Sequence, residues 1–215
     1  MPEPVAQEGE SATAATSPPA ESCEMCRVEI GPRHGHVADV EGHRLLCTCR
    51  PCYLLFTGHG AGASRFLAVP EEWRRVDDVA VSQGQWDTLQ FPVDLAFLFR
   101  QTGADAFMAY YPGPGGATES LLDLASWDDV MTTNPVLQQV QTDVEAILLR
   151  RMKGGVFHTY LVPIDRCYEL VGIVRESWSG FSGGAEVWAR IEGFFDDLDR
   201  RAKTVDRHGE AVARA

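Results

Sequence analysis

The sequence predicts an α+β protein in which a small cysteine-rich module, of the zinc-knuckle or treble-clef type, precedes a larger domain built on an antiparallel sheet. Three observations lead to this prediction. Five of the six cysteines are concentrated in residues 22–60, apolar strand patterns follow them, and amphipathic helical patterns occupy the last third of the chain.

Composition divides the chain into four segments. Residues 1–21 are rich in Pro, Ser, Ala, Thr and Glu, and we expect them to form a disordered tail. Residues 22–60 form the cysteine-rich module, which is too short to bury a large core without a bound metal. After a glycine-rich joint, residues 65–203 form the α+β domain, and the polar residues 204–215 are expected to fray.

The charge balance excludes nucleic acid as the main partner. The net charge is −12, with 31 acidic residues against 19 Lys and Arg, whereas phosphate binding requires clustered basic side chains. The N-terminus lacks the basic and apolar regions of a secretory signal, and no apolar run reaches the roughly 18–20 residues that span a bilayer. We therefore expect a cytoplasmic protein without membrane insertion, in which thiols stay reduced and clustered cysteines bind metal.

Two C-x2-C pairs, Cys23/Cys26 and Cys49/Cys52, are separated by 22 residues. Each pair places two thiolates on one tight turn, and two such turns complete the tetrahedral shell of a zinc ion. The segment between the pairs alternates polar and apolar residues, which predicts a β-hairpin. A proline inside the second pair is expected to open a helix that holds the last cysteine in its first turn. Four thiolates leave no open coordination position, so this Zn²⁺ would be structural.

The ligand set stays open at two points. Either Cys47 or Cys49 can be the third ligand, and the other is then a small buried residue. His34, His36 or His43 is within reach as a substitute at one position. An iron–sulfur cluster is the alternative occupant of the same cysteines.

Apolar runs predict the strands of the larger domain. They lie at residues 65–69, 95–99, 106–111 and 156–162. The second and third runs are separated by a short segment that contains Gly103, which predicts an antiparallel hairpin.

Three helices are predicted from apolar residues at helical spacing. The first covers residues 134–153, with an Asn-Pro pair at its start and two glycines after its end. Asp165 is expected to cap the second, whose apolar stripe includes Tyr168. The third begins near Ala185 and buries one face. That face consists of Val187, Trp188, Ile191, Phe194, Phe195 and Leu198.

A glycine-rich segment directly follows the third predicted strand. Gly113, Gly115 and Gly116 allow backbone N–H groups to approach an anion, with Thr118 and Glu119 as polar contacts. The segment lacks the Gly-Lys-Ser/Thr of a P-loop, and its prolines remove two donors. It is therefore either a rigid loop that turns the chain or a binding loop for a partner or small ligand.

The remaining polar candidates have simpler structural explanations. Cys167 lies near a helix N-terminus, where a thiol is activated, but its neighbours face the core and we expect it to be buried. His59, between glycines, is a candidate mobile ligand. Asp165 could act as an acid/base group with Glu169 or with Glu119 only if both side chains faced one pocket. No catalytic triad or zinc-protease motif is present, so nothing in the sequence indicates an enzyme.

Five segments carry a family resemblance. They are residues 23–56, 85–99, 110–124, 134–151 and 162–188, and they include the motifs CEMC, CTCRPC, PGPGGATES and PID. Together they resemble an uncharacterised bacterial family, domain of unknown function 5947, over about residues 22–198. The loop departs from the family pattern, because it has Gly-Pro-Gly-Gly where Ser-Pro-Ala-Gly is expected.

The resemblance implies a context and no established activity. Members of this family are commonly encoded beside nickel–iron hydrogenase genes in actinobacteria and related organisms. We therefore expect a zinc-binding accessory or adaptor protein for hydrogenase assembly or maturation, with a hydrogenase subunit or maturation factor as its partner. The alternative is an iron–sulfur or metal-transfer redox protein that uses the C-x-C-x2-C cluster.

Overall fold

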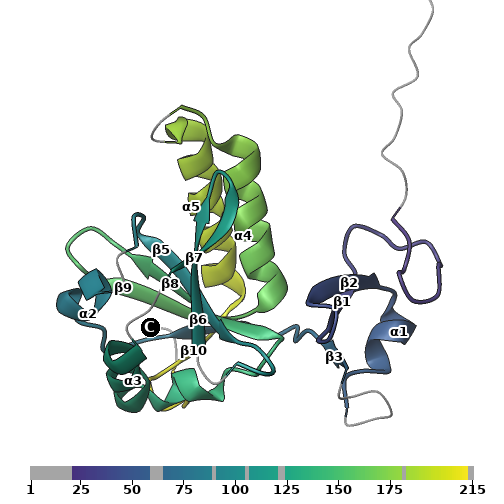
Figure 1. The fold of residues 1–215 in the computed structure, drawn as a ribbon, viewed down its shortest axis with the longest axis horizontal. Coiled ribbons are helices and arrows are strands. Elements are labelled where there is room, and N and C mark those ends of the chain that lie inside the picture. The colour runs from purple at the N-terminus through teal and green to yellow at the C-terminus, as the bar shows by residue number, and fades with distance from the viewer. Residues whose placement is uncertain are drawn as a thin grey trace, which may run out of the picture.

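The structure is a computed structural model that describes residues 21–58, 65–88, 91–104, 107–120, 124–180 and 183–212. It contains a small sheet with one short helix and a larger sheet flanked by the other helices (Figure 1). The predicted α+β class is confirmed, with a cysteine cluster near the N-terminus and sheets that are mainly antiparallel. The predicted disordered tail falls outside the described residues, except for Glu21.

The small sheet has the strand order β2-β1-β3. β1 (Gly35–Asp39) and β2 (Arg44–Thr48) form the predicted hairpin, and α1 (Arg50–Leu54) follows it. The third strand is β3 (Phe66–Ala68), which pairs antiparallel with β1. The first strand predicted for the larger domain therefore exists, but it pairs in the small sheet.

Within the described residues, the larger sheet has seven strands in the order β10-β4-β9-β8-β5-β6-β7. Neighbouring strands are antiparallel, except for the parallel pair of β10 and β4. The sheet includes the predicted hairpin of β5 and β6. Its strands are β4 (Arg74–Val76), β5 (Leu95–Arg100), β6 (Phe107–Gly113), β7 (Gly116–Ser120), β8 (Glu145–Arg151), β9 (Phe157–Pro163) and β10 (Lys203–Val205).

Side chains of the central strands alternate between two separate cores. In β8, Ala146 and Leu148 pack into one core, while Ile147 and Leu149 pack into the other. All four side chains are fully buried. A strand covered on both faces has no polar side, and so it appears in the sequence as a continuous apolar run.

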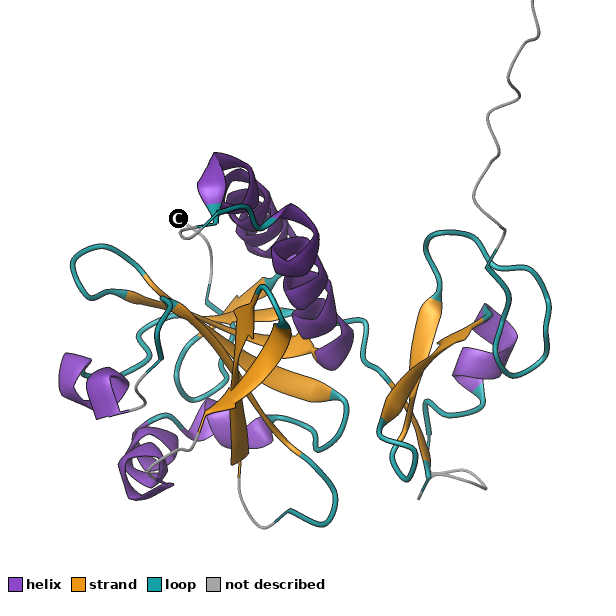
Figure 2. Cartoon of the chain, turned by 45° about the horizontal axis from the view of Figure 1, so that its top comes forward, coloured by secondary structure: helices purple, strands orange, loops and turns teal. Residues whose placement is uncertain are grey.

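Helices cover the two faces of the larger sheet. α4 (Ile164–Ser177) and α5 (Gly184–Arg201) pack on one face, where they lie side by side (Figure 2). α2 (Gln83–Thr88), α3 (Leu124–Thr133) and the 3-10 helix η1 (Pro135–Gln139) contribute to the core on the other face. Among the described residues, no helix combines the length and the apolar character needed to cross a membrane.

The prediction of a helix at residues 134–153 is wrong. Pro135 does follow a cap position, but the turn it opens is the short η1, and β8 begins six residues after η1 ends. The Asn134 side chain makes no capping bond; its amide donates to the carbonyl groups of Ala80 and Val130. Periodicity alone cannot separate a buried strand from a buried helix, and here the pairing of β8 with β5 and β9 decides for the strand.

The other two predicted helices are present, with local corrections. α4 starts one residue before Asp165, and its N-cap is Pro163 without a side-chain cap. Tyr168 and Trp188, both predicted in apolar faces, are 57% and 41% exposed. The remaining residues predicted for the buried face of α5 are all buried, as expected from their spacing.

The chain after α5 does not fray where the sequence predicts. Thr204 and Val205 lie in β10, which pairs with β4, and Val205 is buried in the second core. Asp206 then accepts hydrogen bonds from the backbone N–H groups of His208 and Glu210 at 2.8 and 2.9 Å. These polar residues form a turn because their backbone groups find partners inside the segment.

Candidate metal centre

The first cysteine pair lies on a tight turn before the hairpin. The N–H of Arg27 donates to the carbonyl oxygen of Cys23 at 2.8 Å, and the N–H of Cys23 donates to that of Val28, also at 2.8 Å. Arg27 has a φ of 68°, a left-handed conformation that residues other than glycine seldom adopt. The turn brings the thiols of Cys23 and Cys26 within 4.8 Å of each other.

The second pair lies at the start of α1. Cys49 is the N-cap residue, and the N–H of Tyr53 donates to its carbonyl oxygen at 2.9 Å. Pro51 fits the first turn because an N–H there would have no acceptor within the helix. Cys52 therefore lies in the first turn of α1, where the sequence predicts it.

Backbone contacts hold the two turns together. The N–H of Glu24 donates to the carbonyl oxygen of Cys47 at 2.9 Å. In return, the N–H of Cys47 donates to the Glu24 carboxylate at 2.6 Å. The end of β2 is therefore fixed against the first turn, and Cys49 follows two residues later.

The four sulfur atoms of Cys23, Cys26, Cys49 and Cys52 all lie within 4.8 Å of one another. Those of Cys26 and Cys49 are 3.6 Å apart. A tetrahedral ion with Zn–S bonds of about 2.3 Å separates its sulfur ligands by about 3.8 Å. Four cysteines this close could hold a metal ion. Cys23 is fully buried, whereas Cys26 is exposed.

The thiols of this cluster differ widely in pKa. Burial opposes ionisation of Cys23, but backbone N–H groups of Cys49, Cys26 and Met25 outweigh it and lower the pKa of the Cys23 thiol to about 6. Burial raises the pKa of Cys52 to about 12, and the neighbouring thiols add to this increase. One thiolate therefore forms readily, while ionisation of the full set requires a cation to neutralise it.

Cys47 lies with a different set of residues. Its sulfur is within 4.8 Å of ring nitrogens of His34 and His36. Of the two cysteines that the sequence leaves open as third ligand, Cys49 is therefore the one that lies with the other three. The third candidate histidine, His43, belongs to neither group in the described part of the chain.

The glycine-rich segment is a β-hairpin at the edge of the larger sheet. Gly113 ends β6, and it pairs with Gly116, the first residue of β7. Gly116 has a φ of 122°, which favours glycine. Thr118 and Glu119 lie in β7, and the Tyr110 hydroxyl donates to the Glu119 carboxylate at 3.5 Å. The segment is thus a tight turn between paired strands, and ligand binding by it stays a prediction.

The other polar candidates are dispersed. Cys167 is buried in the core, and this burial raises the pKa of its thiol far above the usual range. Asp165 and Glu169 line one cavity, but Glu119 is not among its lining residues. Glu169 is also held in an ion pair with Arg166. His59 lies outside the described residues.

One contact of Asp165 has no signal in the sequence. Its Oδ2 atom accepts a hydrogen bond from Nδ1 of His36, 2.8 Å away, and the two residues are 129 positions apart. Asp165 was expected to cap α4, which it does not do. Its carboxylate instead links α4, which packs on the larger sheet, to His36 in the hairpin of the small sheet.

The model of a family of unknown function, DUF5947, matches residues 22–202. This range includes both cysteine pairs and every helix and strand named above except β10. No curated protein and no solved structure matches the chain.

Proposed function

The chain belongs to the DUF5947 family of unknown function, and on that basis we propose that it is a zinc-binding adaptor protein that acts in nickel–iron hydrogenase assembly or maturation. One Zn²⁺ bound by Cys23, Cys26, Cys49 and Cys52 would shape the surface that docks the partner. The observation that carries the proposal is the convergence of four sulfur atoms within 4.8 Å of one another.

A structural role for the ion follows from the ligand set. Four thiolates fill a tetrahedral shell, so no position remains for water or substrate. The two turns and the hairpin between them form a unit of about 40 residues, a size at which metal binding commonly supplies the folding free energy. The ion would therefore determine whether this unit is ordered.

The docking surface we propose is formed by the exposed apolar residues beside the ligands. Val28 follows Cys26 and is 51% exposed, while Leu54 and Leu55 follow Cys52 and are 51% and 68% exposed. Large apolar side chains in water are a common feature of protein contact surfaces. Their backbone is fixed by the cysteine turns, so metal binding and partner binding would be coupled.

The hydrogenase part of the proposal is supported by the family resemblance described above. The net charge of −12 is compatible with a partner that presents a basic surface, because complementary charge speeds association. The partner we propose is a hydrogenase subunit or a maturation factor.

Metal analysis of cysteine variants tests the zinc site. We expect Cys26→Ser and Cys52→Ser each to lose the bound Zn²⁺ and to lose hydrogen-exchange protection in residues 21–58. Cys167→Ala is the matched control, because its thiol is buried in the larger core and does not belong to the four-cysteine group. Unchanged metal content and unchanged protection in both serine variants would falsify the zinc site.

A pull-down from hydrogenase-expressing cells tests the adaptor role. We expect the chain to capture a hydrogenase subunit or maturation factor, and Leu55→Asp to abolish the capture by placing a charge in the apolar contact. Val156→Asp is the control, since Val156 is 58% exposed but lies in the turn between β8 and β9. If neither class of protein is recovered at low salt, the adaptor role is contradicted. Equal loss of capture in both variants contradicts it as well.

A second candidate function is favoured by the exposure of Cys26. A ligand that water and other proteins can reach suits an iron–sulfur cluster or a metal that is passed on, rather than one that is retained. The visible spectrum of anaerobically purified protein separates the candidates. An iron–sulfur protein absorbs visible light, whereas a zinc protein is colourless.

A further inference from the structure

Three more potential metal ligands converge on one face of the β1–β2 hairpin. His36 in β1 is directly opposite Cys47 in β2. Side chains two residues apart in an extended chain point to the same face, and His34 precedes His36 by two residues. The ligand atoms of His34, His36 and Cys47 lie within 4.8 Å of one another, and the two imidazole rings are 4.9 Å apart between centroids.

Both histidines use Nδ1 for a hydrogen bond. Nδ1 of His34 lies 2.9 Å from the carbonyl oxygen of Gly31, so it carries the proton and donates. Nδ1 of His36 lies 2.8 Å from Oδ2 of Asp165 and likewise donates a hydrogen bond to this carboxylate. In each neutral ring the Nε2 atom then keeps its lone pair, which is the form that binds a metal.

The free nitrogen of His34 is buried and has no partner. Its side chain is only 9% exposed, and Nε2 makes no hydrogen bond in the described part of the chain. A buried polar atom without a partner destabilises the folded state, because it has lost its hydrogen bonds to water. The same applies to Oδ1 of Asp165, the second oxygen of the carboxylate that holds His36. A bound ion beside His34 would satisfy the orphaned nitrogen.

We propose that His34, His36 and Cys47 bind a second metal ion, a divalent transition-metal ion of the Zn²⁺ type, next to the four-cysteine site. Two imidazole nitrogens and one thiolate are the ligands that such borderline ions prefer. Three protein ligands leave a fourth position open, unlike the closed shell of four thiolates. This second site is therefore able to bind an exogenous ligand.

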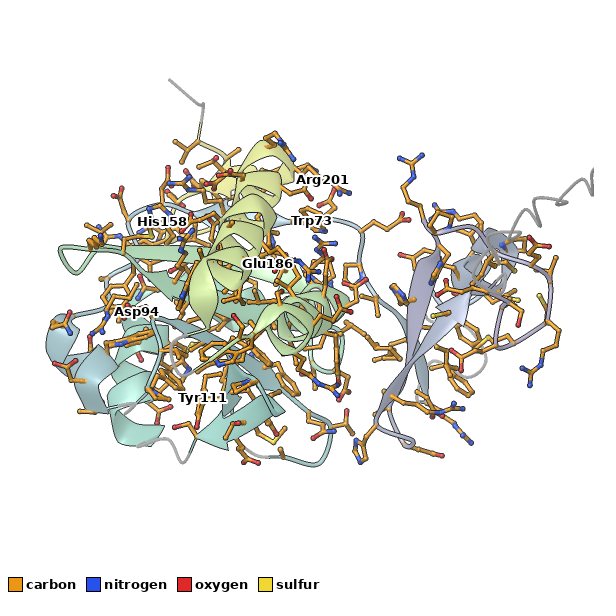
Figure 3. All side chains as sticks on the ribbon, turned by 90° about the horizontal axis from the view of Figure 1, so that it is seen from above. Trp73, Asp94, Tyr111, His158, Glu186 and Arg201 are labelled. Carbon is orange, nitrogen blue, oxygen red and sulfur yellow. The ribbon has the colours of Figure 1, made fainter. Side chains whose placement is uncertain are left out.

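A cavity of about 1140 Å³ lies beside this group of ligands, and the small sheet and the larger domain line it together. All three ligands line it, and so do Trp73 and Arg201 of the larger domain. Figure 3 shows these two residues on the side of the larger domain that faces the small sheet, and the Arg201 guanidinium lies 3.9 Å from the centre of the Trp73 ring. The cavity gives water or a small ligand a route to the ion.

Asp165 is a positioning residue for this site. It does not belong to the group of ligand atoms, and it acts by holding the His36 ring through Nδ1. A carboxylate behind a metal-binding histidine fixes the ring and increases its basicity, and its loss commonly weakens metal binding by about 10–100-fold. Because Asp165 belongs to α4, it ties the metal site to the larger domain.

Titration of the metal-free full chain with Co²⁺, followed by elemental analysis after desalting, tests the proposal. We expect the wild type to bind two ions, and His34→Ala, His36→Ala and Cys47→Ser each to bind one. His43→Ala is the matched control, because His43 lies in the same hairpin and lines the same cavity but is outside the group, and it should still bind two. Asp165→Asn should bind two ions, with the Kd of the second about 10–100-fold higher.

The retained ion reports on folding in every one of these variants, since a collapsed hairpin would lose both. A wild type that binds a single ion, lost on replacing Cys26, overturns the second site and leaves the proposed zinc adaptor intact. A single ion that is lost on replacing Cys47 but not Cys26 supports the second site and overturns the four-cysteine one. Two ions in Cys47→Ser also overturn the second site.

Discussion

In the small sheet, the local backbone conformation decides which group of potential ligands each cysteine joins. Cys47 and Cys49 are separated by one residue, yet Cys47 is opposite His36 in the hairpin while Cys49 has left the strand and caps α1. The C-x-C-x2-C run therefore contributes to two groups of potential metal ligands. The change of backbone conformation after Thr48, from strand to helix, is what separates them.

Asp206 allows a residue-scale prediction in the larger domain. The N–H of Glu210 lowers the pKa of the Asp206 carboxyl. Desolvation of the carboxylate opposes this, and the N–H of His208 adds to the lowering. The folded state thus favours the ionised form, so Asp206 stabilises the protein above the ordinary carboxyl pKa of about 3.9. This contribution is lost as the pH falls through the lowered folded pKa.

We expect Asp206→Asn to decrease the free energy of unfolding near neutral pH, and the difference from wild type to shrink as the pH falls below about 4. Denaturant unfolding of both proteins across this range measures it, with the fluorescence of the larger domain as the signal. A difference that is the same at pH 3 and pH 7 contradicts the prediction.

At the scale of elements, the packing of α1 against β1 depends on one glycine. A Cβ atom added to Gly35 would lie 2.6 Å from the Tyr53 ring, far inside van der Waals contact. Tyr53 is buried, and its hydroxyl donates to the carbonyl oxygen of Val69 at 2.9 Å. The ring therefore has little freedom to move away from an added methyl group. The approach of helix to hairpin places Cys52 beside the first cysteine turn.

We expect Gly35→Ala to destabilise the small sheet by about 1–3 kcal/mol, the usual cost of inserting a methyl group into a packed contact. Gly31→Ala is the control, because an added Cβ there meets no atom within 4 Å, and it should change stability by less than about 0.5 kcal/mol. Hydrogen exchange of β1 and α1 in zinc-loaded protein measures both. Equal effects at the two glycines would mean that the contact with Tyr53 is unimportant.

For the whole molecule, the two sheets differ in how they are stabilised. The larger sheet has a core on each face, and the second of these cores contains no residue of the small sheet. From the small sheet, only Ala38 is among the buried residues of the first core, with the half-buried Leu45 and Leu67 packed against it. The larger sheet should therefore be stable without metal, while the small sheet should not.

Removal of the metal by a strong chelator tests this difference. We expect hydrogen-exchange protection to disappear from residues 21–58 and to persist in β5, β8 and β9. Adding Zn²⁺ back should restore the lost protection, because the ion and not the chain supplies the missing stability. Simultaneous loss of protection in both sheets would show that they fold as one unit.

The sequence by itself determined the features that depend on local chemistry. The two C-x2-C turns, the hairpin between them, the helix opened by Pro51 and the amphipathic α5 are each specified by residues a few positions apart. These predictions are confirmed because spacing and turn chemistry act over the same short range as the structures they produce.

Only the tertiary structure decided the features that depend on distant partners. β8 is a strand because β5 and β9 flank it, β3 joins the small sheet because β1 is its neighbour, and β10 is ordered because β4 pairs with it. His36 meets Asp165 across 129 residues. Such contacts cannot be predicted from the spacing of residues along the chain, because they depend on how separate elements pack.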